Sequence, residues 1–251
     1  MSGRLHIRHS FFCGAPRRRD TTLRLGPSHR EPLRLARRRL RVATVKPLRL
    51  LVYDATQRAR PPRALGLSWQ VGSYLYRGLG RIDAALGARS FEEAFAWLAT
   101  HERERPIAEL QFWGHGKWGR ALIDRESLDR RALSPGHPLH GGLSAFRERL
   151  SDDALIWFRT CETLGAAPGH SFASALSDFL GASVAGHTFV IGFFQSGLHR
   201  LRPGMMPSWS ADEGLSRGTA ERPEAAFGSD PRQPNTITCL TGRIPDSVDQ
   251  S

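Results

Sequence analysis

Residues 107–116 decide the fold, and they read Ile-Ala-Glu-Leu-Gln-Phe-Trp-Gly-His-Gly. The apolar part of this stretch stops at Trp113, and two glycines then bracket His115. A second apolar run, at residues 154–158, stops shortly before Cys161. Short apolar runs bounded by turn residues are typical of buried strands. The sequence therefore predicts two buried strands, with His115 and Cys161 just beyond their carboxyl ends.

Helical and extended patterns alternate on both sides of these two runs. They predict strands at 48–53, 107–113, 154–158 and 183–191, and helices at 90–98, 143–150 and 171–180, while residues 72–86 fit neither pattern clearly. Ser90 is expected to cap the first of these helices, with Glu93 completing a capping box. Alternating strands and helices favour an α/β fold, here a three-layer α/β/α sandwich with a mostly parallel sheet. In such sheets the loops at the carboxyl ends of the strands form the site.

Positive charge is concentrated at the amino-terminal end of the chain. Of 36 basic residues, 13 lie within residues 1–46, where they face only two acidic ones, Asp20 and Glu31. Residues 1–46 are therefore predicted to form a disordered basic tail, with a nucleic-acid arm, a membrane-surface arm or a transit peptide as alternatives. The rest of the chain is nearly neutral, which argues against a nucleic-acid-binding domain. It divides into an α/β domain at 47–202 and a Pro/Gly/Ser-rich segment at 203–251, with an edge strand expected at 236–240.

The cysteine count and the lengths of the apolar runs bear on the location of the protein. The apolar runs are too short to cross a bilayer, and no secretory signal is visible. Three cysteines are an odd and small number, which argues against a disulfide framework. These features predict a cytoplasmic protein without a membrane span.

His115 and Cys161 carry the chemistry that the sequence suggests. Taken singly, a cysteine in an apolar setting is an inert buried thiol, and a lone histidine is structural. Placed together at the ends of neighbouring strands, the two have the geometry that a thiolate nucleophile and its base require. Gly114 and Gly116 let the backbone turn sharply and approach a substrate. No ligand set with metal-site spacing surrounds His137 and His140, so we expect neither a metal nor a cofactor.

These residues resemble the caspase-like cysteine peptidases, and most closely their bacterial CHAT-like branch. Family members have a strand ending in His-Gly-x-x-Gly, which here is His115-Gly116-Lys117-Trp118-Gly119. A second strand ends in Ala-Cys-Glu-(Thr/Ser)-Gly, and here stands Thr160-Cys161-Glu162-Thr163-Leu164-Gly165. The resemblance covers about residues 48–200. The chain departs from the pattern at Thr160, where Ala is usual, and at Leu164, which is an extra residue before the glycine.

The resemblance implies a caspase-like fold and a cysteine endopeptidase acting on a peptide or protein through a thioester. Cys161 would be the nucleophile and His115 the general base or proton donor, and the amides of Gly116 and Cys161 would stabilise the oxyanion. Pocket residues in this family select the side chain before the cleaved bond, and the candidates here are Asp54, Glu162, Gln195 and Ser196. The extra residue Leu164 and the unsettled identity of the pocket residues favour the alternative, a catalytically silent caspase-like module that binds a partner or regulates. The family often works beside regulatory protein partners.

Overall fold

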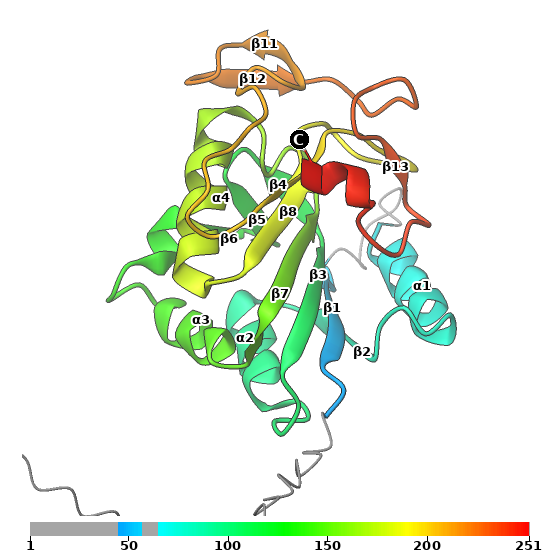
Figure 1. The fold of residues 1–251 in the computed structure, drawn as a ribbon, viewed down its shortest axis with the longest axis vertical. Coiled ribbons are helices and arrows are strands. Elements are labelled where there is room, and N and C mark those ends of the chain that lie inside the picture. Colours follow the sequence, from blue (N-terminus) through cyan, green and yellow to red (C-terminus); the bar gives the residue numbers. More distant parts are fainter. Residues whose placement is uncertain (1–44, 57–64, 251) are drawn as a thin grey trace, which may run out of the picture. The chain divides into compact units, whose positions relative to one another are not determined.

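A six-stranded sheet places the two predicted strands side by side. Its strand order is β10-β8-β7-β3-β1-β2 (Figure 1). The strands are β1 (Leu48–Asp54), β2 (Ala84–Ala88), β3 (Ile107–Trp113), β7 (Leu150–Arg159), β8 (Ser183–His187) and β10 (Leu198–Leu201). All neighbouring pairs are parallel except β10 with β8. This computed structural model describes residues 45–56 and 65–250, so the predicted tail at 1–46 lies almost entirely outside the described residues.

Helices cover both faces of the sheet. The helices α2 (Phe91–Thr100), α3 (His140–Arg147) and α4 (Ala166–Leu180) lie on one face. The other face is covered by α1 (Leu65–Gly78) and by the C-terminal segment, which ends in the short helix η3 (Asp246–Gln250) (Figure 1). The prediction of an α/β fold around a mostly parallel sheet is therefore confirmed, and the layers are compatible with a three-layer sandwich.

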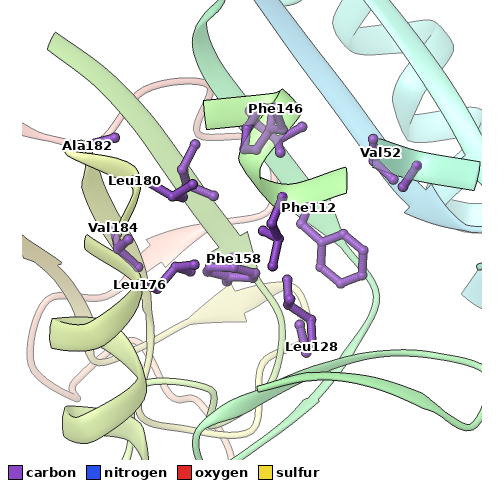
Figure 2. Close-up of a cluster of buried hydrophobic side chains, with 14 of the residues drawn as sticks. Val52, Phe112, Leu128, Phe146, Phe158, Leu176, Leu180, Ala182 and Val184 are labelled. Atoms are coloured by element: carbon purple, nitrogen blue, oxygen red, sulfur yellow. The ribbon is translucent and has the colours of Figure 1, made fainter. Parts of the chain in front are cut away.

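The largest hydrophobic cluster lies between the sheet and helices α2, α3 and α4. Phe112 and Phe158 come from neighbouring strands, Phe146 from α3, and Leu176 and Leu180 from α4 (Figure 2). Each of these side chains is buried, and burying one contributes about 1.5–3 kcal/mol. Two smaller clusters cover the opposite face of the sheet, one beneath α1 and one beneath the C-terminal segment.

The helix at 90–98 is confirmed as α2, with one correction to its capping. The Ser90 hydroxyl accepts a hydrogen bond from the amide of Glu93 at 3.1 Å, as a helix cap does. The Glu93 carboxylate, however, accepts from the amide of Arg89 at 2.7 Å instead of from Ser90. The capping box is thus only half formed, because the carboxylate bonds one residue further back.

Several element boundaries differ from the prediction. Helix α4 begins five residues earlier than expected, because Pro168 lies in its first turn, where the missing N–H has no helical partner to lose. Helix α3 begins at His140, and the next strand already starts at Leu150. Strand β8 ends at His187, after which the amide of Thr188 donates to the carbonyl of Gly197. The ambiguous stretch 72–86 holds the end of α1 and the start of β2.

Short strands surround the central sheet. A small three-stranded sheet is formed by β4 (His115–Lys117), β5 (Arg120–Ile123) and β6 (Glu126–Asp129), followed by the helix η2 (Arg130–Leu133). The expected edge strand at 236–240 is reduced to β13 (Ile237–Thr238), which pairs with β9 (Phe194–Gln195). A hairpin joins β11 (Leu215–Gly218) and β12 (Pro223–Ala226). Among the described residues, no helix is both long and apolar enough to cross a membrane.

Candidate active site

Sheet topology brings His115 and Cys161 to one edge. Strand β2 lies on one side of β1, and β3 lies on its other side. The connection from β1 to β2 and the chain that continues from β3 therefore run in opposite directions across the sheet. Crevices at the carboxyl ends of strands form where connections diverge in this way. Trp113 and Arg159 are paired across β3 and β7, and His115 and Cys161 each follow two residues later. The predicted placement beyond two neighbouring strand ends is therefore confirmed.

His115 and Cys161 both line a cavity of about 640 Å³. This volume is in the range of ordinary ligand sites, about 300–1,000 Å³. The lining comes from α1, from the ends of β3 and β7, from residues 190–195, and from the C-terminal segment. The described residues that line it are Ser68, Trp69, Gly72, Leu75, Tyr76, Trp113, Gly114, His115, Arg159, Cys161, Val190, Ile191, Gly192, Phe193, Gln195, Cys239 and Leu240.

The His115 ring is held by an aromatic contact. It meets Trp69 of α1 edge-on, with 5.6 Å between the ring centroids. Among the residues that the structure describes, none forms a hydrogen bond with the His115 ring. Within the described part of the chain, the imidazole is therefore oriented by packing against Trp69 and by no hydrogen-bonding third group.

Cys161 presents a half-buried thiol. Its Sγ lies 3.8 Å from the carbonyl oxygen of Ile191. Burial raises the pKa of the Cys161 thiol above its ordinary value; the nearby Glu162 carboxylate adds to this rise, and Lys117 opposes it. The resting form at neutral pH is therefore the thiol. No described backbone carbonyl accepts from the amide of Cys161, which instead donates toward its own sulfur.

Alkylation of Cys161 should therefore need high pH. We expect its rate with iodoacetamide to rise about tenfold per pH unit through the neutral range, because only the thiolate reacts. The rise should continue beyond the pH at which the same cysteine levels off in the denatured chain. Mass spectrometry of the Cys161 peptide at a series of pH values measures both curves. A plateau below pH 7 in the folded protein would contradict the assigned direction of the shift.

Gly116 allows strand β4, which holds His115, to lie directly against the loop that carries Cys161. A Cβ atom on Gly116 would overlap Thr163 Oγ1 and would lie 2.5 Å from the carbonyl oxygen of Cys161. Thr160 and Thr163 bond to each other through their hydroxyl groups beneath this contact. The amide of Gly119, a glycine with a φ of 75°, donates to the carbonyl of Thr163 at 3.0 Å. Strand β4 is thus fixed directly against the loop that carries Cys161.

An ion pair makes a second connection between these two segments. Lys117 Nζ lies 3.2 Å from Glu162 Oε2, and Glu162 is buried. Lys117 Nζ also lies 3.8 Å from the centre of the Trp118 ring. Glu162 has a φ of 52°, an unusual backbone conformation for a residue with a side chain. The geometry uses Glu162 to hold the loop, and this residue is not among those lining the cavity.

Thr160 and Leu164, the two residues that depart from the caspase-like motif, are both buried in the protein. Leu164 is fully buried in the largest cluster, and its carbonyl accepts a hydrogen bond from Trp209 Nε1 at 3.1 Å. His199 stacks on Trp209 and lies 2.6 Å from Glu213. Thr160 is also fully buried. Neither Thr160 nor Leu164 lines the cavity, so the extra residue supports the loop from below.

Only one of the four predicted pocket residues lines the cavity. Gln195 does so, with its Oε1 accepting from Arg159. Asp54 is fully buried and accepts from the amide and hydroxyl of Thr56 at 2.8 and 2.6 Å, an arrangement that stabilises the turn after β1. The Ser196 hydroxyl is bonded to Thr236 at 2.7 Å. Asp54 and Ser196, like Glu162, make structural bonds outside the lining.

Arg159 is the main residue of this site that the sequence did not identify. It is almost fully buried, and its guanidinium lies 4.6 Å from the centre of the Trp157 ring. It donates to Gln195 Oε1 at 2.7 and 3.0 Å and to the Tyr76 hydroxyl at 2.6 Å. It also donates, at 3.0 to 3.2 Å, to the carbonyls of Thr238, Cys239 and Thr241. Arg159 thus holds the C-terminal wall of the cavity against the sheet.

We compared the chain with known protein families, curated proteins and solved structures. No family model, no curated protein and no solved structure matches the chain. The functional argument therefore depends on the cavity and its residues.

Proposed function

We propose that the protein is a caspase-like cysteine endopeptidase in which Cys161 attacks a peptide carbonyl and His115 acts as base and then acid. The observation that carries the proposal is that both side chains line one cavity at the carboxyl edge of a parallel sheet. The close fit of Gly116 against the carbonyl of Cys161 also supports it. The fit requires a residue without a side chain at position 116, which explains why a glycine follows His115.

The raised pKa of Cys161 determines the form of the proposed mechanism. Since the thiol is protonated at rest, His115 takes its proton as Sγ bonds to the carbonyl carbon. The carbonyl electron pair moves to the oxygen, where the Cys161 amide donates to it. The tetrahedral species then expels the amine, which takes the proton from His115. Water, with His115 again acting as base, hydrolyses the thioester and frees Cys161.

Cleavage of a peptide library tests this proposal. Cys161→Ala and His115→Ala should each lower kcat/KM by about 1,000-fold or more, since each removes half of the reacting pair. Cys13→Ala, which changes a cysteine outside the described residues, serves as the matched control and should keep wild-type activity. Thermal unfolding of each variant shows whether the fold is retained.

The second candidate is a catalytically silent module with the same fold. The raised pKa of Cys161 favours it, because a buried neutral thiol is a weak nucleophile. Its signature is a wild-type protein that cleaves no library member faster than Cys161→Ala does. That result, together with equal alkylation of Cys161 in wild type and His115→Ala, would replace the peptidase proposal by the silent one.

A further inference from the structure

We infer that the cavity beside Cys161 binds a large apolar side chain of the substrate, next to the bond to be cleaved. The inference rests on the proposed peptidase function and names its substrate class. Its basis is the chemistry of the residues that line the cavity. They disfavour basic side chains of the substrate, they disfavour acidic ones, and they favour apolar ones.

The first reason concerns substrates with arginine or lysine at this position. Among the described residues lining the cavity there is no aspartate and no glutamate. The formal charge in that lining is the positive one on Arg159, which would repel a second cation. A basic side chain would therefore lose its hydration without gaining a carboxylate partner.

The second reason concerns acidic substrates. Arg159 would attract a carboxylate, but its donors are already used within the protein. Nε donates to Gln195, Nη1 to Tyr76 and a carbonyl, and Nη2 to Gln195 and two carbonyls. A guanidinium has five N–H groups, and the six contacts cover all three nitrogens. A carboxylate in the cavity would therefore be desolvated without receiving a hydrogen bond from Arg159.

The third reason is the apolar character of the remaining wall. Aromatic and aliphatic side chains line it from three directions: Trp69 and Leu75 from α1, Ile191 and Phe193 from the segment at 190–195, and Leu240 from the C-terminal segment. Leu75, Phe193 and Leu240 are also strongly exposed, at 46%, 58% and 50%. Exposed apolar groups around a cavity gain by covering an apolar ligand. A leucine, methionine or aromatic side chain satisfies all three conditions.

Cleavage of peptides that differ only at this position tests the inference. We expect bulky apolar residues to exceed alanine in kcat/KM by at least about tenfold, as the loss of methylene groups from an apolar pocket predicts. Leu75→Glu should shift the preference toward arginine and lysine by a similar factor. Leu67→Glu is the matched control, because Leu67 is an exposed leucine of the same helix outside the lining. A wild-type preference for aspartate, glutamate, arginine or lysine would overturn the inference while leaving the peptidase function intact.

A binding measurement separates this inference from the catalytic proposal. Cys161→Ala protein is titrated with N-acetyl-phenylalaninamide and with N-acetyl-aspartamide, and the amide resonances are followed by NMR. The apolar ligand should bind at least about tenfold more tightly, and Leu75→Glu should weaken the binding of the apolar ligand without strengthening that of the acidic one. If the apolar ligand binds tightly but the wild type cleaves no peptide, the proposed peptidase function is wrong and the cavity is still a site for an apolar side chain. Equal binding, or tighter binding of the acidic ligand, would end the cavity assignment itself.

Discussion

Gly116→Ala is expected to lower kcat/KM of the proposed peptidase by about 100-fold or more. The added methyl group would overlap Thr163 Oγ1 and press on the Cys161 carbonyl, so β4 and the nucleophile loop must separate. A displacement of about 1 Å between reacting groups is enough for a loss of this size. The overlap should also destabilise the fold by about 1–3 kcal/mol. Peptide cleavage and denaturant unfolding measure the two effects.

Gly141→Ala is the matched control for Gly116→Ala. A Cβ atom on Gly141 meets nothing within 4 Å, and the residue lies in helix α3. Alanine is favoured over glycine in a helix by about 0.5–1 kcal/mol, so this variant should be slightly more stable and fully active. If Gly116→Ala retained wild-type activity and stability, β4 would not be fixed against the loop as the contacts indicate.

Arg159→Met is expected to reduce the free energy of unfolding by about 1–3 kcal/mol, the cost of leaving a buried hydrogen-bonding group without its donor. Methionine fills part of the space but leaves the side-chain oxygen of Gln195 and the Tyr76 hydroxyl without the donor that Arg159 supplies, while the three carbonyls keep donors from Tyr76 and from the amide of Thr241. Buried acceptors that lose their donors retain the full cost of desolvation. Chemical denaturation monitored by circular dichroism measures the change.

Two further arginine variants sharpen this prediction. Arg159→Lys keeps the charge but offers three donors in place of five, so its stability should lie between wild type and Arg159→Met. Arg217→Met removes a surface pair with Glu224 and should change stability by less than about 1 kcal/mol. A loss from Arg159→Met no larger than that of Arg217→Met would show that the C-terminal segment is held by other contacts.

The sequence contained enough information for the sheet and for the pair at its edge. Phe112 and Phe158 lie in apolar runs that end at glycine or polar residues, and such runs form buried parallel strands. Since parallel strands end at the same edge, the positions of His115 and Cys161 followed from the strand assignment alone. Their catalytic roles remain predictions.

The rest of the site depends on contacts that no local pattern records. Arg159 reads as a polar residue at a strand end, yet it binds carbonyls of residues 238–241. Strands β4, β5 and β6 have only three or four residues each, too few for a period to be visible. Asp54 was a pocket candidate because of its place after a strand, but the nearby Thr56 already uses its carboxylate. Local chemistry at a turn and a substrate pocket produce the same sequence signal.

The hydrogen bonds of Arg159 also bear on the order in which parts of the protein fold. Its carbonyl partners follow it by 79 to 82 residues, so joining them closes a longer loop than pairing β1 with β3 or β3 with β7, and the entropy cost of closure rises with loop length. Strands β1, β3 and β7 can pair before residues 238–241 are in place, because their contacts are closer in sequence. We therefore expect the sheet to assemble first and the cavity to be enclosed last. A newly made chain would hold His115 and Cys161 at their strand ends before it had a pocket for any substrate.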